Sequence, residues 1–402
     1  MGRFLCRVKK VATTNTNKHS QRRVIVIVPL VPEYRRALYA QLHDRLKRHD
    51  IDFVVMSGEP SPRIRDRSDR ILEDWSRPLT SKWIQVWGKE IGFRTLGYRG
   101  LTPYDYVIVE QALKNMETYP LLALMKLGRI HLAMWGHGDT YSVTQSKSLR
   151  KLKILITKSC ERVFVYTEMG SQYLIKSGVE EGGITILNNS IDTETLSNDL
   201  DLVTDIEKAH LKSKYDLTEG RTALFIGGVD KSKGIPFLVN AAKSIAQIDP
   251  TFRLLIVGEG SMSKKLKTTL DPNGPIFLLG RRTGREKAIA LSCANVLTVP
   301  EWIGLVSVDS LVSGVPIVST DHPSHSPEKE YLVDGETAVF SNHNVIDYAQ
   351  AVYDVLSDPV RLQSMRAKCL SEARNHSFND YVDRFEVGIL DWIRASDPSF
   401  IS

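Results

Sequence analysis

The sequence has only four cysteines, and they lie far apart along the chain: Cys6, Cys160, Cys293 and Cys369. They form no C-x-x-C pair, which argues against both a disulfide framework and a zinc cluster. No uninterrupted apolar run approaches the roughly 18–20 residues that cross a bilayer, and the basic start lacks the apolar stretch of about 7–15 residues that directs export. We therefore expect a cytoplasmic protein that is neither secreted nor anchored by a membrane span.

Several catalytic motifs are also missing. The sequence contains no H-E-x-x-H, no G-x-S-x-G and no G-x-x-x-x-G-K-[ST] segment, so metalloprotease, serine hydrolase and P-loop chemistries have no support. Gly258-Glu-Gly260 lacks the third glycine of a dinucleotide-binding fingerprint, which argues against nicotinamide chemistry. The aromatic residues that interleave a single-stranded nucleic-acid groove are absent as well, so we expect no nucleic-acid partner.

Positive charge is concentrated in the first half of the chain. Residues 1–23 contain seven basic residues and no acid, and we expect them to form a flexible basic arm. Residues 1–195 carry a net charge of +11 and residues 196–402 carry −5, which indicates that the two halves face different partners.

One basic segment is also amphipathic. Residues 147–158 hold five cations, no acid and three apolar residues at helical spacing, Leu149, Leu152 and Ile156. Such a run is usually a solvated helix face above a core stripe. Together with the basic arm, it also suits a weak electrostatic hold on an anionic membrane surface, which would bring a lipid-linked acceptor beside the first half of the chain.

Short apolar runs alternate with helical segments in two successive series. Val24–Val28 is entirely β-branched, which predicts a strand buried on both faces. After residue 220 the pattern begins again, with strands expected at 223–226, 252–257, 276–279, 296–299 and 315–319. The alternation predicts an α/β protein of two doubly wound, Rossmann-like domains, 24–195 and 196–377, joined through the acidic stretch 192–219. Ligands of such sheets bind beyond the carboxyl ends of the strands.

The strongest candidate site lies in the segment 299–316. After a strand, a loop carries Glu301, and a helix is expected to start near Gly304 and to end at Gly314. The unpaired amides at the start of that helix, Gly304, Leu305 and Val306, suit a phosphate because the helix dipole is positive there. Asp309 lies about one turn inside the helix, where its carboxylate can accept from a vicinal diol. Alternatively, Glu301 is a solvated loop acid and Asp309 belongs to a polar helix face.

The Glu-x7-acid spacing of this segment, followed by S-G-V-P-I-V, resembles the signature of glycosyltransferase family four. Further segments resemble other motifs of that family and occur in its order: 187–192, 225–234, 254–260, 330–335 and 378–385. The resemblance implies the GT-B fold, in which two Rossmann-like domains face each other across a cleft, and a retaining enzyme. The loops 32–36 and 135–138 resemble those of members that build bacterial surface polysaccharides.

The resemblance implies roles for the residues of the main motif. Glu301 would hydrogen-bond hydroxyls of the donor sugar, and the backbone at Gly304, Leu305 and Val306 would hold the diphosphate. Asp309 would hold the ribose of the nucleotide, at a position where the family usually has glutamate. The shorter side chain makes the nucleotide preference harder to infer from the motif.

The resemblance also implies a set of donor-binding residues upstream. Lys233 would pair with the leaving diphosphate, and Gly227 lies in the same strand-loop segment. Gly228 stands where the family usually has an arginine. We expect Arg281 or Arg282 to supply the missing charge, because a diphosphate that leaves without a metal needs cations; alternatively, both are solvated loop residues.

Two histidine-containing segments complete the candidate site. His137 stands between two glycines at a strand end; a lone histidine is more often packed or solvated, but the resemblance implies contact with the donor sugar. It is not expected to be the base, because in the family's usual scheme the leaving phosphate takes the acceptor proton. Residues 321–328 hold two histidines with acids. Their spacing matches no zinc pattern, so donor contact is favoured over metal binding, and no metal cofactor is expected.

We therefore predict a metal-independent hexosyl-type glycosyltransferase that moves a sugar from a nucleotide-diphosphate donor to a saccharide or lipid-linked saccharide in polysaccharide biosynthesis. The second domain would bind donor, the first would bind acceptor, and a helix within 378–402 would pack back on the first domain. Two alternatives remain: a nucleotide-sugar epimerase or hydrolase of the same fold, and a non-catalytic nucleotide-sugar-binding protein, which the replacements at Gly228 and Asp309 leave open. Peripheral attachment to the inner face of the cell membrane fits the basic half.

Overall fold

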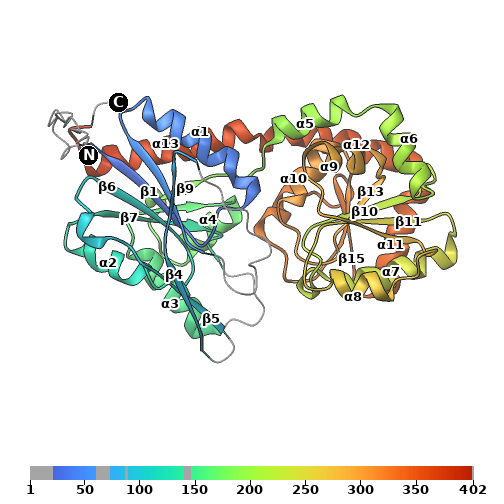
Figure 1. Ribbon diagram of the computed structural model, residues 1–402, viewed down its shortest axis with the longest axis horizontal. Helices are drawn as coiled ribbons and strands as arrows, with labels where there is room; N and C mark the ends of the chain where they lie inside the picture. The colour runs from blue at the N-terminus through green and yellow to red at the C-terminus, as the bar shows by residue number, and fades with distance from the viewer. Residues whose placement is uncertain (1–20, 60–72, 87–88, 140–145, 401–402) are drawn as a thin grey trace, which may run out of the picture.

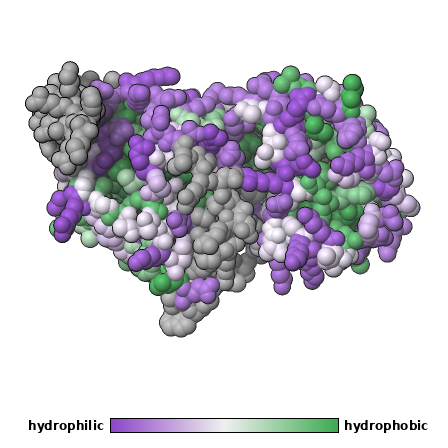
Figure 2. All heavy atoms as spheres, in the orientation of Figure 1, coloured by the Kyte–Doolittle hydropathy of each residue, from purple (hydrophilic) through white to green (hydrophobic). Residues whose placement is uncertain are grey.

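The computed structural model describes residues 21–59, 73–86, 89–139 and 146–400. They form two α/β domains that lie side by side along the long axis of the molecule (Figure 1). Residues 1–20 of the expected basic arm, with Cys6, lie outside the described residues. Polar side chains cover most of the face shown in Figure 2, and apolar ones gather in smaller groups. Within the described ranges, no helix has both the length and the hydropathy to cross a bilayer.

The first domain is built on seven parallel strands in the order β3-β2-β1-β6-β7-β8-β9. Val24 and Val26 of β1 join one core cluster and Ile25 and Ile27 join another, so β1 is buried on both faces as predicted. The strands are β1 (Arg23–Val28), β2 (Asp52–Ser57), β3 (Ser76–Pro78), β6 (Asp105–Glu110), β7 (His131–Gly136), β8 (Arg162–Val165) and β9 (Ile184–Ile186). The helices between them are α1 (Arg36–Lys47), α2 (Thr118–Lys126), α3 (Lys147–Lys158) and α4 (Glu168–Lys176).

A two-stranded antiparallel hairpin, β4 (Ser81–Val86) and β5 (Lys89–Arg94), projects from the first domain (Figure 1). The sequence analysis did not predict this hairpin. Its anchor is an ion pair between Arg94, at the end of β5, and Glu117, at the start of α2; both side chains are almost fully buried. Trp83 of β4 packs on Gly92, where a Cβ would lie 2.9 Å from the indole ring. The ion pair therefore fixes the hairpin that carries Trp83.

The second domain is built on six parallel strands in the order β12-β11-β10-β13-β14-β15. The strands are β10 (Thr222–Ile226), β11 (Arg253–Val257), β12 (Ile276–Gly280), β13 (Val296–Thr298), β14 (Ile317–Thr320) and β15 (Ala338–Ser341). The helices of this domain are α7 (Ile235–Ile248), α8 (Ser263–Thr269), α9 (Gly284–Cys293), α10 (Val306–Ser313), α11 (Val345–Ser357) and α12 (Pro359–Glu372). Two parallel sheets with helices between their strands confirm the predicted fold class, two Rossmann-like α/β domains.

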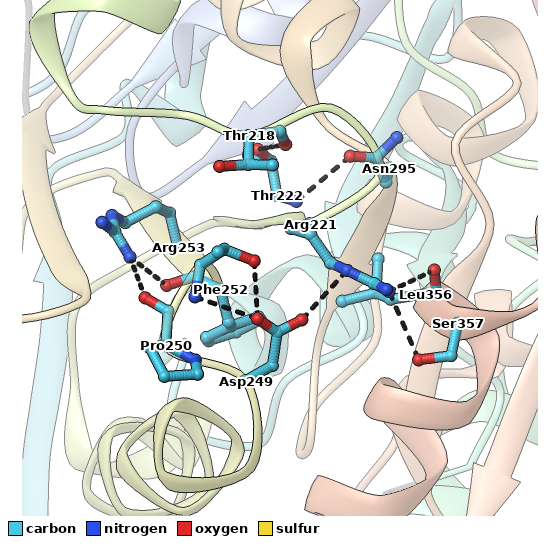
Figure 3. Close-up of polar contacts among 11 residues, drawn as sticks. Thr218, Arg221, Thr222, Asp249, Pro250, Phe252, Arg253, Asn295, Leu356 and Ser357 are labelled. Atoms are coloured by element: carbon cyan, nitrogen blue, oxygen red, sulfur yellow. Dashed lines mark hydrogen bonds and ion pairs between the residues drawn. The ribbon is translucent and has the colours of Figure 1, made fainter.

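Polar contacts close the amino ends of the second sheet (Figure 3). Arg221, just before β10, pairs through Nε with Asp249 at 2.9 Å and donates from Nη1 to the carbonyl of Leu356 at 2.8 Å. Asn295, just before β13, accepts the amide of Thr222 at 3.1 Å. These contacts occupy the amino ends of the strands. Ligands of such sheets bind at the opposite, carboxyl ends.

The stretch 192–219, expected to join the two halves, contains two helices, α5 (Thr193–Leu202) and α6 (Asp205–Lys214). Both pack against α9 of the second domain, and α5 also packs against α10. Thr204 and Glu207 form a capping box at the start of α6, so this acidic stretch contains a local signal for the start of a helix.

The last helix, α13 (Phe378–Ser396), leaves the second domain and packs on α1, β8 and β9 of the first (Figure 1). Phe385 lies in the core cluster of the first domain. Gly388 permits the close approach, since a Cβ there would lie 2.6 Å from Thr185 and 2.9 Å from Phe164. The chain thus crosses between the domains twice, once before α5 and once before α13.

Candidate active site

The carboxyl ends of both sheets meet at a cleft with two adjoining cavities, of about 770 and about 1380 Å³. Gly227, Gly228, Ile191 and Lys287 line both cavities, so the two form one continuous space. Residues of both domains line each cavity. Because a single ligand pocket usually spans about 300–1000 Å³, the combined space has room for a nucleotide sugar and an acceptor.

Helix α10 begins at this cleft, close to where the sequence predicts it. Leu305 is its N-cap, and Gly314 ends it in the left-handed conformation at φ 67°. Gly304, Leu305 and Val306 line the smaller cavity. Their three amides donate no hydrogen bond within the described part of the chain, whereas the next amides bond back to the carbonyls of residues 304 and 305. The site therefore offers a cluster of donors at the positive end of a helix.

Lys233 lies on the wall of the same cavity. Its Nζ donates to the carbonyl of Trp302 at 3.0 Å, and Trp302 holds a left-handed backbone conformation at φ 56°. A bulky residue rarely adopts that conformation, and such strain is concentrated at functional loops. Lys233 is thereby held against the loop that leads into α10.

Glu301 sits beside this loop rather than among the residues that line the two cavities. Its carboxylate bonds His343 Nε2 at 3.1 Å, and the His343 ring stacks on Phe237. Ligand atoms of Glu301, His322 and His343 lie within 4.8 Å of one another, so this trio is the group of described residues that could hold a metal ion. The same carboxylate and imidazoles can also bind sugar hydroxyls.

Asp309 is buried at the cavity wall, so it does not belong to a polar helix face as the alternative interpretation had it. Its carboxylate pairs with Lys287 of α9, whose Nζ lies 2.6 Å from Oδ1. Lys287 lines both cavities. A cation that no sequence motif indicated therefore stands next to the acid expected to bind ribose.

Arg281 and Arg282 follow β12 and line the larger cavity only. Arg282 pairs with Glu286 at 2.5 Å. Gly227 and Gly228 line both cavities, and the chain is so close there that a Cβ at Gly258 would lie 1.8 Å from the carbonyl oxygen of Gly227. The two arginines thus lie in the larger cavity, whereas the start of α10 lines the smaller one.

His137 follows β7 and lines the smaller cavity from the first domain. Its ring packs edge-on against Tyr166, with the centroids 4.5 Å apart. Burial, with Lys153 and Arg35 nearby, lowers the pKa of His137 to about 3. The imidazole is therefore neutral at physiological pH and acts there as a hydrogen-bonding group, not as a cation.

Comparison with known proteins assigns part of the chain to a family. The family described as "Glycosyl transferases group 1" matches residues 220–358, the stretch that contains Lys233, Glu301 and Asp309. Residues 220–358 are a group 1 glycosyltransferase domain. The resemblance to glycosyltransferase family four that the motifs predicted is thus confirmed for the second domain.

The curated relatives match different lengths of this chain. The D-inositol 3-phosphate glycosyltransferase of Corynebacterium aurimucosum is 24% identical over 229 residues, which cover 52% of this chain and 53% of that protein. The chain therefore spans about half the length of this relative. The 2-deoxystreptamine N-acetyl-D-glucosaminyltransferase of Niallia circulans is 21% identical over 354 residues, 85% of each protein.

Solved structures confirm the predicted GT-B fold for the chain as a whole. Anabaena Alr3699/HepE, solved in complex with UDP-glucose, matches with a TM-score of 0.64 at 12% identity and covers 92% of this chain and 99% of its own. Sucrose-phosphate synthase from Thermosynechococcus elongatus matches with a TM-score of 0.66 at 15% identity, covering 93% and 100%. At these identities the likeness concerns the fold alone.

Within the glycosyltransferase domain, one of the two histidines of residues 321–328 has a structural role. His325 is buried; its Nδ1 accepts the amide of Ile303 at 3.1 Å and its Nε2 donates to the carbonyl of Thr320 at 2.9 Å. Acceptance at Nδ1 needs the neutral ring, because a protonated nitrogen cannot accept, and burial lowers the pKa of His325 to about 4. His325 thereby pins the loop that leads into α10.

This lowered pKa predicts a loss of stability in acid. Between pH 6.5 and about 4 the unfolded chain binds a proton at His325 that the folded protein does not, so stability falls as pH falls through that window, by about 3 kcal/mol in total. Above pH 6.5 His325 is neutral in both the folded and the unfolded chain, so it no longer makes stability depend on pH. Denaturation of the wild type and of His325→Gln between pH 4.5 and 7.5 should show a shallower pH slope in the variant; equal slopes would contradict the assignment.

Several residues that line the smaller cavity were not predicted from the sequence. The smaller cavity is also lined by five residues of the first domain, Tyr34, Arg35, Trp83, Glu110 and Lys114. Tyr34 and Arg35 lie in a loop that the resemblance did single out, but nothing in the sequence placed their side chains opposite α10. Only the folded arrangement brings these residues to the glycosyltransferase domain.

Proposed function

We propose that this protein is a retaining glycosyltransferase that moves a sugar from a nucleotide-diphosphate donor to a saccharide or lipid-linked saccharide, as in the synthesis of a surface polysaccharide. The observation that carries the proposal is the start of α10, where the three amides of residues 304–306 have no partner within the described chain and line the cleft together with Lys233. A diphosphate complements such a site because it offers several anionic oxygens to fixed donors.

In this proposal the nucleotide lies on the second domain. Its diphosphate accepts from the amides of 304–306 and from Lys233. Asp309 accepts from the ribose hydroxyls and gives up its ion pair with Lys287, which then turns toward the phosphates. Lys287 would thus supply charge that Gly228 cannot, with Arg281 and Arg282 serving the far end of the donor.

The donor sugar and the acceptor would meet in the smaller cavity. The neutral imidazole of His137, on the wall of this cavity, and Glu301, beside the loop that leads into α10, would hold the sugar hydroxyls from opposite domains. The acceptor hydroxyl attacks the anomeric carbon on the side of the leaving phosphate, the bond from that carbon to the phosphate oxygen breaks, and a phosphate oxygen takes the proton. The amides and cations of the protein disperse the leaving charge, so the scheme uses no metal.

A donor screen followed by a transfer assay tests the proposal. Thermal shifts with uridine, guanosine and adenosine diphosphate sugars identify the donor, and UDP-glucose is the first choice because HepE was solved with it. The expected result is release of nucleoside diphosphate that depends on a glycolipid acceptor and gives a product of retained anomeric configuration. Donor consumption without acceptor would favour the epimerase or hydrolase, and binding without consumption would favour the non-catalytic protein.

We also propose that the first domain attaches to an anionic membrane surface through α3. Leu152 and Leu155 of α3 are 41% and 63% exposed, and Lys147, Lys151 and Lys158 are exposed as well. Leu152 therefore faces solvent instead of completing the expected core stripe, while Ile156 is buried. A helix that exposes both leucine and lysine fits the interface of an anionic bilayer.

Reversing two of these charges should detach the protein from vesicles. Lys151→Glu/Lys158→Glu is expected to lower binding to phosphatidylglycerol vesicles at least about tenfold, because each lysine near the surface contributes about 1 kcal/mol. Lys243→Glu, on the second domain, is the control and should bind as the wild type does. Co-sedimentation at low salt measures the effect; equal binding of all variants would contradict the membrane proposal.

A further inference from the structure

Arg35 is one of the cations, with Lys114, that the first domain places in the smaller cavity beside His137 and the aromatic residues. It ends the short 3-10 helix Glu33–Arg35 between β1 and α1. Its guanidinium lies over the ring of Trp135, 4.3 Å from the centroid, and its Nη2 donates to the hydroxyl of Tyr166 at 2.5 Å. These contacts hold the group in one place at the cavity wall.

The charge of Arg35 has no counter-ion among the described residues. Its Nε is buried and makes no hydrogen bond there. Arg94, a fully buried arginine of the same domain, is paired with Glu117, whereas Arg35 is partly buried. A guanidinium withdrawn from water without an anion is unfavourable, so its retention in a cleft needs an explanation.

Each carboxylate that lines the same cavity has another polar partner, although Oε2 of Glu328 is buried without one in the described chain. Glu110 accepts from Asn115 at 3.1 Å, Glu328 accepts from Asn189 at 2.8 Å, and Asp309 pairs with Lys287. Burial raises the pKa of Glu328, although the nearby charge of Arg35 opposes that shift. None of the three forms an ion pair with Arg35 within the described chain.

We propose that Arg35 binds an anionic oxygen of a bound substrate, either a carboxylate or phosphate of the acceptor saccharide or a phosphate of the donor. This inference rests on the proposed function. Arg35 belongs to the domain proposed to bind the acceptor, and its planar fork matches a carboxylate or a phosphate in two parallel hydrogen bonds. Tyr34, which is 46% exposed, and Trp83 of the hairpin line the same wall and offer flat faces to a sugar ring.

Two pairs of probes that differ only in charge test the inference and separate its sources. Methyl glucuronide and methyl glucoside report an acceptor anion, and uridine diphosphate and uridine report a donor anion. Saturation-transfer NMR or calorimetry compares their affinities for the wild type, Arg35→Gln and Arg48→Gln, an exposed arginine at the end of α1 that controls for net charge. Lost charge-assisted hydrogen bonds should lower the affinity of the relevant charged probe about tenfold to a hundredfold in Arg35→Gln.

The outcomes distinguish an anion of the acceptor from an anion of the donor. Loss of the preference for glucuronide assigns Arg35 to the acceptor, and loss of affinity for uridine diphosphate but not uridine assigns it to the donor. Arg35→Gln should also keep or raise the melting temperature, because it removes an unpaired charge. A lowered melting temperature with unchanged probe affinities would overturn the inference and make Arg35 structural. If no nucleotide binds, the proposed function fails, while the glucuronide comparison still tests Arg35.

Discussion

Replacing Lys233 by alanine is expected to lower the rate of sugar transfer by at least about a hundredfold while leaving the fold intact. The side chain donates to the carbonyl of Trp302 at the cavity wall, beside the start of α10. In the proposed mechanism its charge is worth most when the diphosphate departs, and removing one such donor typically costs about 10²–10³ in rate. Steady-state kinetics with the donor found by thermal shift measures the effect.

Lys231→Ala is the matched control, because Lys231 lies in the same short helix as Lys233 and is exposed. It should transfer sugar at the wild-type rate. Glu301→Ala should be as inactive as Lys233→Ala, since it removes the carboxylate proposed to hold the donor sugar. Full activity in both Lys233→Ala and Glu301→Ala would defeat the assignment of the site.

Replacing Glu117 by leucine is expected to destabilise the first domain by about 3–5 kcal/mol, the usual cost of removing one partner of a buried ion pair. The change leaves the guanidinium of Arg94 without an anion, and Arg94 and Glu117 are 0% and 1% exposed. For a domain of this size the melting temperature should fall by roughly 6–20 °C. The hairpin that carries Trp83 should lose its anchor at the same time.

The double variant Arg94→Leu/Glu117→Leu distinguishes an unpaired charge from lost packing. It should recover much of the stability that Glu117→Leu loses, because two apolar residues leave no buried charge behind. Glu286→Leu, which breaks the more exposed pair with Arg282, should change stability by less than about 1 kcal/mol. A double variant as unstable as Glu117→Leu would show that packing, not charge, accounts for the effect.

The sequence was informative wherever local patterns determine structure. The β-branched run at 24–28 is a buried strand, and the spacing from Glu301 to Gly314 placed a helix start within two residues of where it lies. These predictions succeeded because strand burial and helix termination depend on neighbouring residues. The family match covers residues 220–358, which contain Glu301 and Gly314.

The site's partners could not be read in this way, because they come from distant parts of the chain. Lys287 reaches Asp309 from another helix, and His325 reaches Ile303 from another loop. The hairpin 81–94 was not predicted, and its anchor depends on an ion pair with Glu117. Only the folding of each domain brings such groups together.

The most direct test of the whole account is the affinity of uridine diphosphate for Gly304→Ala, measured by calorimetry. A Cβ at Gly304 would meet only the Ser326 hydroxyl oxygen, at 4.0 Å, so the fold should be unaffected while a methyl group is added where the diphosphate is proposed to bind. We predict at least about tenfold weaker binding of uridine diphosphate, unchanged binding of uridine, and wild-type behaviour of the surface control Gly182→Ala. Wild-type affinity for uridine diphosphate in Gly304→Ala would contradict diphosphate binding at the start of α10.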